Sequence, residues 1–158
     1  MNYPQESPLR IGVGIVLLNH ENKVFVGKRI DNPKNFWQMP QGGVNKNEDF
    51  LQAAKRELEE ETGIKSVTLI KEVKEWFEYD LPKHLLGKIW KGKYRGQKQR
   101  WYIMKFFGKE EEINIKTKNP EFLDWKWIEP SMLPGIAVNF KVNIYKKLKE
   151  ELSFLHAN

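Results

Sequence analysis

The segment between Asp49 and Gly63 most limits how this chain can fold. Asp49 is a typical helix N-cap residue, with Gln52 three positions later as in a capping box. Gly63 stands where a residue in the left-handed conformation commonly ends a helix. Between them, apolar residues recur at the spacing of a helix buried along one side: Phe50, Leu51, Ala54 and Leu58. The sequence therefore predicts an amphipathic helix from about residue 50 to 62.

The last turn of this predicted helix carries four carboxylates, Glu57, Glu59, Glu60 and Glu61. A helix C-terminus is already negative, and like charges three or four positions apart cost about 0.2–0.5 kcal/mol per pair. A rotation of about 100° per residue places Glu59 on the solvent side and the other three beside the apolar stripe. A charged surface helix explains Glu59 but not those three. A divalent cation should offset them, and an all-oxygen ligand set favours Mg²⁺ or Mn²⁺. Arg56, among these acids, is expected to pair with a neighbouring carboxylate.

The rest of the chain predicts an α/β fold, a mixed sheet with helices on its faces. Strands are expected at residues 9–19, 24–29, 66–73, 76–81, 97–107 and 124–128, and loops at 32–35 and 41–43. An amphipathic helix is expected at about 140–154. The organisation expected is a short tail, residues 1–8, and a single domain, residues 9–155.

The amino-acid composition excludes several kinds of functional site. Without cysteine there is no disulfide, thiolate metal site or cysteine nucleophile. No stretch reaches the roughly 18 apolar residues of a membrane span, and the first residues lack the pattern of a secretory signal, so a cytoplasmic protein is expected. The net charge is +6, and residues 81–109 contain nine lysines or arginines and no acid. That stretch is either a solvated face or a surface for polyphosphate or nucleic acid.

The residues around the predicted helix also resemble a known family motif. Gly42, Glu48 and the run Arg56-Glu57-Leu58-Glu59-Glu60-Glu61-Thr62-Gly63-Ile64 match every fixed position of the Nudix box, G-x5-E-x7-R-E-U-x-E-E-x-G-U with U apolar. Residues 10–14, 37–43, 96–101, 120–122 and 138–141 are similar to the bacterial RNA pyrophosphohydrolase branch, which overlaps with the dinucleoside polyphosphate hydrolases. The similarity covers roughly residues 10–152. It departs at 122–125, where Phe-Leu-Asp-Trp replaces the usual Phe-Asp-Gly-Trp.

The resemblance implies a Nudix α/β/α sandwich and attack by water on a phosphorus of a nucleoside polyphosphate. It implies that Glu60 and Glu61 are metal ligands, and that Glu57 is either a third ligand or the general base. Glu121 would be the family's later acidic residue, a metal ligand and the other candidate base. A main-chain carbonyl of Gly42 or Gly43 would also bind metal. More than one Mg²⁺ or Mn²⁺ ion is expected, whereas Glu48 is expected to be structural.

The resemblance also suggests substrate contacts, each of which has a plainer interpretation. Arg10, Arg29 and Lys141 are candidates to bind the polyphosphate, or they are ordinary surface charges. Tyr79 and Phe140 could stack on a base or belong to the core. Gln97, Lys98 and Gln99 begin a predicted strand, where core packing would favour apolar residues, so these three are predicted to bind substrate rather than only to pack.

Three functions fit these observations. The first is removal of the terminal phosphates from 5′-triphosphate RNA, which leaves a 5′-monophosphate. The second is hydrolysis of diadenosine polyphosphates by the same site. The third is a non-catalytic RNA- or partner-binding module, which would be expected to have lost glutamates from the box. The basic stretch and the run Gly96-Gln97-Lys98-Gln99-Arg100-Trp101 favour RNA as the substrate.

Overall fold

The computed structural model describes residues 8–31 and 34–156, so the expected tail 1–8, except Pro8, and the first half of the expected loop 32–35 lie outside it. Seven strands and three α-helices follow one another along these residues. They are β1 (Leu9–Leu18), β2 (Val24–Arg29), β3 (Gln41–Gly43), α1 (Phe50–Thr62), β4 (Val67–Glu72), β5 (Phe77–Asp80), β6 (Gly96–Phe106), β7 (Phe122–Ile128), α2 (Leu133–Ile136) and α3 (Val142–Glu151).

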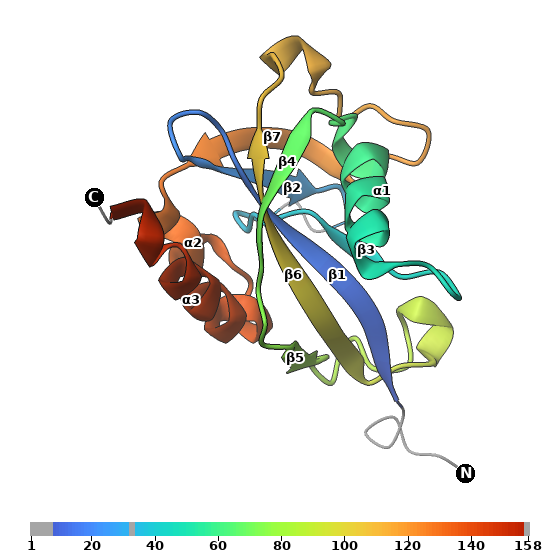
Figure 1. Cartoon of the computed structure of the whole chain (residues 1–158). Helices are drawn as coiled ribbons and strands as arrows, with labels where there is room; N and C mark the ends of the chain where they lie inside the picture. The colour runs from blue at the N-terminus through green and yellow to red at the C-terminus, as the bar shows by residue number, and fades with distance from the viewer. Residues whose placement is uncertain (1–7, 32–33, 157–158) are drawn as a thin grey trace.

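The strands form one mixed sheet whose main path runs β4-β6-β1-β2-β7. At its centre β1 and β6 pair in parallel from Leu9 opposite Gly96 to Leu18 opposite Lys105. The other pairings are antiparallel, with β3 alongside β1 and β5 alongside β6. Figure 1 shows the long β1 and β6 ribbons crossing the molecule side by side.

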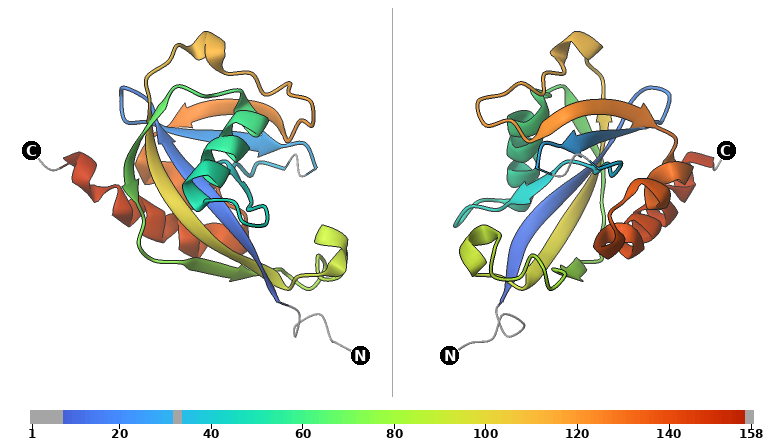
Figure 2. Two further views of the ribbon diagram at one scale, coloured as in Figure 1. Left: turned by 45° about the vertical axis from the view of Figure 1, so that its right-hand side comes forward. Right: turned by 180° about the vertical axis from the view of Figure 1, so that it is seen from behind.

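Helices cover both faces of the sheet. Strand residues alternate in direction, so successive residues of β1 belong to different cores. Val13, Ile15 and Leu17 pack with Ala54 and Leu58 of α1. On the other face Val16 and Leu18 pack with residues of α2 and α3, namely Leu133, Ile144, Tyr145 and Leu148. Figure 2 shows α1 on one side of the sheet and α2 with α3 on the other, which confirms the predicted α/β/α sandwich.

Helix α1 begins and ends where its sequence predicts. The backbone N–H of Gln52 donates to Asp49 Oδ2 at 3.1 Å, so Asp49 is the N-cap. Gly63 has a φ of 75° and its N–H donates to the carbonyl of Glu59. A residue with a Cβ adopts this left-handed backbone at a cost, which is why glycine suits the helix end.

One prediction about secondary structure was wrong. Residues 41–43, expected to be a loop, form β3, because the backbone of Gly42 and Gly43 pairs closely with Val13 and Gly12 of β1. In addition, no helix was predicted where α2 lies. It has four residues and contains a proline, so it is too short to show a helical period. Within the described ranges, no helix combines the length and the apolarity that a membrane crossing requires.

Candidate active site

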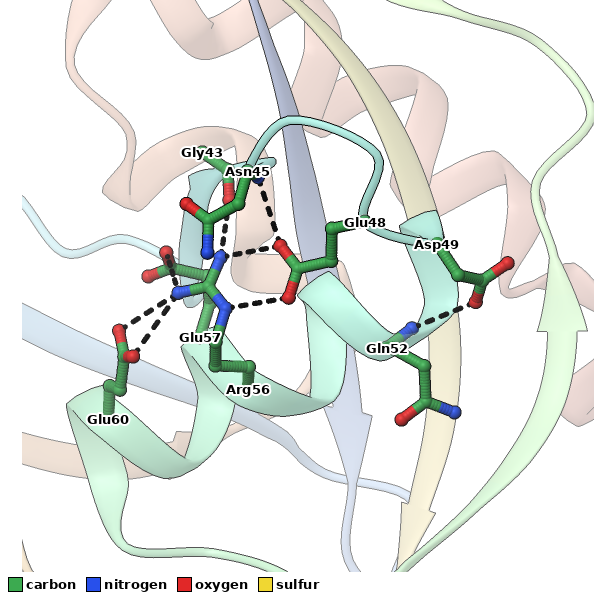
Figure 3. Close-up of polar contacts among 8 residues, drawn as sticks. All are labelled: Gly43, Asn45, Glu48, Asp49, Gln52, Arg56, Glu57 and Glu60. Carbon is green, nitrogen blue, oxygen red and sulfur yellow. Dashed lines mark hydrogen bonds and ion pairs between the residues drawn. The ribbon is translucent and has the colours of Figure 1, made fainter.

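Arg56 is the centre of an ion-pair cluster on α1 (Figure 3). Its Nε and Nη2 donate to the two carboxylate oxygens of Glu48 at 2.8 and 2.9 Å. Its Nη1 donates to Glu57 at 2.9 Å and to Glu60 at 3.1 and 3.2 Å, and Nη2 also reaches the carbonyl of Gly43 at 3.0 Å. The predicted pairing of Arg56 with a neighbouring carboxylate is confirmed. These hydrogen bonds lower the pKa of Glu48 to about 2, consistent with its expected structural role.

The helix carboxylates differ in their surroundings. Arg56 holds Glu57 and Glu60, whereas Glu61 lies buried, 5% exposed. Among residues 8–31 and 34–156, no three acidic, histidine or cysteine side chains converge closely enough to form a ready cation site. Glu57, Glu60 and Glu61 all line the same cleft, and the guanidinium of Arg56 supplies a counter-charge to the first two.

Glu61 lacks such a counter-charge at hydrogen-bonding distance. Its Oε2 is buried and has no hydrogen-bond partner among the residues that the structure describes. Burial raises the pKa of Glu61 well above its usual range, and the nearby charges of Glu57 and Glu121 raise it further, against the lowering effect of Arg29. A buried carboxylate oxygen without a partner is costly, and a cation is the partner that would relieve this cost.

The residues beside Glu61 fit a hard divalent ion. The available donors are carboxylate and carbonyl oxygens, which Mg²⁺ and Mn²⁺ prefer. Gly42 lies so close to Glu57 that a Cβ at position 42 would overlap the Glu57 carboxylate. Glycine at this position therefore lets the main chain of β3 approach the acidic side chains of α1.

A cleft of about 1310 Å³ brings most of the candidate residues together. Its lining includes acids from α1 and from the segment before β7, Gly42 of β3, and cations and aromatic residues from four other segments. The candidates that line it are Arg10, Arg29, Gly42, Glu57, Glu60, Glu61, Tyr79, Glu121, Phe140 and Lys141. Residues far apart in the sequence thus meet at one surface.

The three candidate cations are held in different ways. Arg29 donates twice to Asp31, at 2.7 and 2.6 Å, and its Nη2 lies 3.7 Å from Glu121 Oε2. The guanidinium of Arg10 lies 5.2 Å from the centre of the Trp90 ring.

Lys141 is only 6% exposed, and its Nζ donates to the side-chain oxygens of Gln38 and Gln41 at 3.2 and 3.3 Å. Burial, together with the charge of Arg29, lowers the pKa of Lys141 from 10.5 to about 7, against the raising effects of Glu61 and Asp31. Two neutral amides therefore hold this cation in the cleft, and no carboxylate of the described residues forms a hydrogen bond with it.

The two candidate stacking residues are neighbours. The rings of Tyr79 and Phe140 lie 5.4 Å apart at 40°. The hydroxyl of Tyr79 donates to Gln97 Oε1 at 2.9 Å, and both residues are buried. Gln97 therefore lies behind the cleft wall and fixes Tyr79, and Phe140 is the more accessible ring of the pair.

Lys98 does not lie in the cleft. Alternation along β6 sends Gln97 and Gln99 to the α3 side and Lys98 to the α1 side. There Lys98 Nζ lies 3.9 Å from Glu78 and 5.2 Å from the Trp76 ring. Lys98 therefore lies outside the pocket that holds Arg29 and Lys141, because one residue of register places it on the opposite face of the strand. Its predicted contact with substrate stays a prediction.

Four residues of the site were not predicted: Asp31, Gln38, Gln41 and Trp90. Asp31 holds Arg29, and the two glutamines hold Lys141. Gln38 and Gln41 belong to the run Trp-Gln-Met-Pro-Gln-Gly-Gly, one of the segments that resemble the family. The sequence therefore offered a reason to select these two residues. Nothing local in the sequence indicates that Trp90 reaches Arg10.

Comparison with known proteins supports one family. The family profile described as NUDIX domain matches residues 8–148. A protein of Pelagibacter ubique named RNA pyrophosphohydrolase is 64% identical over 145 residues, which cover 92% of each chain. A protein of the same name from Orientia tsutsugamushi (strain Boryong) is 43% identical over 144 residues, covering 91% of this chain and 89% of its relative.

Solved structures show the same fold at low sequence identity. The E. coli dihydroneopterin triphosphate pyrophosphohydrolase is similar with a TM-score of 0.68 and 20% identity, over 91% of this chain and 99% of the other. A C. elegans Ap4A hydrolase in a binary complex is similar with a TM-score of 0.63 and 19% identity, over 90% and 98% of the two chains. The profile match spans residues 8–148, and the glutamates of α1 line the cleft. This protein therefore belongs to the Nudix family.

Proposed function

We propose that this protein is an RNA 5′-pyrophosphohydrolase, which hydrolyses a phosphoanhydride bond of 5′-triphosphate RNA and leaves a 5′-monophosphate end. The observation that carries the proposal is the buried, unpartnered oxygen of Glu61, in a cleft that also holds Arg10, Arg29 and Lys141. Acids beside fixed cations suit a polyphosphate with bound divalent ions. The two relatives named RNA pyrophosphohydrolase, 64% and 43% identical, support RNA as the substrate.

The chain's own residues would bind and orient the polyphosphate. Arg29 and Lys141 lie where they can neutralise non-bridging oxygens, and Arg10 extends the positive side of the cleft. Asp31 fixes the guanidinium plane of Arg29, and the Gln38 and Gln41 amides fix Lys141. Phe140, against Tyr79, offers a ring for the first base.

The cofactor proposed is Mg²⁺ or Mn²⁺, in more than one copy. Glu57, Glu60, Glu61, Glu121 and the main chain at Gly42 are the groups that would hold it. When bound, such ions neutralise phosphate charge and make water a better nucleophile. Arg56 would then remain the residue that orients Glu57 and Glu60, because it already contacts both carboxylates.

Two carboxylates are candidates for the general base. Glu57 lies on α1 beside Gly42, and Glu121 lies across the cleft near Arg29. Replacing each carboxylate by its neutral amide, Glu57→Gln or Glu121→Gln, separates the role of general base from the role of metal ligand. Loss of the base lowers kcat and changes the pH–rate profile, whereas loss of a ligand alone is partly recovered at high Mg²⁺.

The test is to compare kcat/KM for 5′-triphosphate RNA and for diadenosine tetraphosphate with Mg²⁺ under the same conditions. The proposal expects preference for RNA and a 5′-monophosphate product. Preference for diadenosine tetraphosphate would make this protein a dinucleoside polyphosphate hydrolase. RNA binding without turnover of either substrate, in the presence of Mg²⁺ or Mn²⁺, would indicate the non-catalytic module.

A further inference from the structure

Residues 82–95, which we call the basic lobe, connect β5 to β6 and border the cleft. They contain Lys83, Lys88, Lys91, Lys93 and Arg95 but no acidic residue. All three views in Figures 1 and 2 place the lobe, in lime green, beside the loop between β3 and α1. Its Pro82, His84, Leu85, Ile89 and Trp90 belong to the cleft lining. The lobe therefore continues the wall of the candidate active site.

The lobe is fixed to the domain by its apolar side. Leu81 N–H donates to the Arg95 carbonyl at 2.7 Å, which closes its base. Leu85, Leu86, Ile89 and Trp90 pack against the core on the α3 side of the sheet. The lobe is thus a built surface rather than a loose loop.

A strained turn separates the two sides of the lobe. Trp90 and Lys91 have φ values of 50° and 58° within the 3-10 helix η2 (Trp90–Gly92). Left-handed backbone at a residue other than glycine costs on the order of 1 kcal/mol or more, and it persists where the surrounding contacts fix it. Here Trp90 points to the cleft and Arg10, whereas Lys91 is exposed.

The lobe's lysines have no acidic partner. Lys83, Lys88, Lys91 and Lys93 are exposed, and none forms an ion pair within the part of the chain that the structure describes. In contrast, Lys98 and Arg100 of the same basic stretch are matched by Glu78 and Glu72. Arg95, at the base of the lobe, is likewise paired with Asp80. The uncompensated lysines of the lobe are therefore the exposed ones beyond the cleft lining.

We propose that the basic lobe binds the phosphodiester backbone of the RNA segment that follows the reacting 5′ end. The inference rests on the proposed function, since it needs the 5′ end to lie in the cleft. A polyanion leaving the cleft along this wall meets lysines with no competing carboxylate. A dinucleoside polyphosphate has no phosphodiester chain beyond the reacting phosphates, so the lobe would discriminate in favour of RNA.

The test compares two triple variants. Lys88→Gln, Lys91→Gln and Lys93→Gln neutralise the lobe, and Lys109→Gln, Lys146→Gln and Lys149→Gln remove the same charge from exposed lysines outside the cleft lining. The substrates are a 5′-triphosphate dinucleotide and an unstructured 5′-triphosphate RNA of about 20 nucleotides, which exceeds the roughly 4–16 nucleotides of a typical single-strand site.

The lobe variant should lose kcat/KM on the long RNA and keep it on the dinucleotide. Each contact with single-stranded phosphate contributes about 0.7 to the salt slope, so three contacts contribute about 2. Between 50 and 200 mM salt, the wild-type affinity should therefore fall about 16-fold more than that of the lobe variant. The control triple should retain the wild-type slope and the wild-type ratio of long to short substrate.

Fluorescence anisotropy with 5′-hydroxyl RNA of the same sequence measures binding without turnover. A lobe variant with the wild-type salt slope and the wild-type ratio between substrates would overturn the lobe's role while leaving the proposed function intact. A wild-type enzyme that hydrolyses neither RNA would instead refute the proposed function.

Discussion

Lys141 should reduce the stability of the protein at neutral pH. Burial lowers its pKa from 10.5 to about 7, so the folded protein binds fewer protons than the unfolded chain between these two values. Below about pH 7 Lys141 is protonated in both the folded and the unfolded state, so the full free-energy cost of burying its charge is present. This cost is relieved as pH rises towards 10.5.

The magnitude can be worked from this shift. At about 1.4 kcal/mol per pKa unit, the fall from 10.5 to about 7 corresponds to a cost of about 5 kcal/mol at low pH. Linkage predicts that the free energy of unfolding rises by about 2 kcal/mol between pH 7 and 9. Lys141→Met removes the charge but leaves Gln38 Oε1 without its donor, at about 1–3 kcal/mol. The expected net gain at pH 6 is therefore about 2–4 kcal/mol.

Urea unfolding at pH 6, 7, 8 and 9, without divalent ions, measures this effect. Lys141→Met should be more stable than wild type at pH 6, with the difference shrinking towards pH 9, and it should lose activity. Lys149→Met, at an exposed lysine of α3, the helix that follows Lys141, is the control and should show the wild-type pH dependence. A Lys141→Met variant no more stable than wild type at pH 6, with a parallel pH profile, would refute the reasoning.

Three further predictions concern the acids and the sheet. Glu61→Gln should lower kcat by orders of magnitude without unfolding the protein, whereas Glu59→Gln, on the solvent side, should be nearly neutral; equal losses in kinetic assays would contradict the assignment of helix faces. Mg²⁺ at 100 times its Kd should add about 2.7 kcal/mol, or roughly 5–10 °C in Tm, and Glu61→Gln should abolish most of that shift in calorimetry. Gly14→Ala should cost about 1–3 kcal/mol in denaturant unfolding, because its Cβ would overlap the buried Trp101 ring; an unchanged midpoint would show that the ring can move.

Local features of the sequence predicted α1 well. Its caps, Asp49 and Gly63, and its apolar stripe are all set within one short segment, so no tertiary information was needed. The pairing of Arg56 was predictable for the same reason, because its partner Glu60 lies one turn away on the same helix. The cleft residues from other segments were found through the resemblance to the Nudix family.

Tertiary geometry decided what the sequence could not. Lys98 lies outside the cleft because of the register between β6 and its neighbours, and a shift of one residue reverses the face of every side chain. Glu60 and Glu61 differ in their surroundings, because Arg56 pairs with Glu60 whereas Glu61 is buried. The face that Lys98 occupies and the burial of Glu61 both depend on packing between segments that are distant in the chain.

The parallel pairing of β1 with β6 has a consequence for how the protein folds. Leu9 can pair with Gly96 only after the whole intervening chain, including α1, has been brought together as a closed loop. Closing so long a loop costs entropy before its contacts form, and such non-local topologies fold slowly. The cleft is built from both parts of the chain: Arg10 and Gly42 precede β6 in the sequence, whereas Glu121 and Lys141 follow it. Hydrolytic activity should therefore return at the rate of the slowest refolding phase, after the helical structure of α1 has formed.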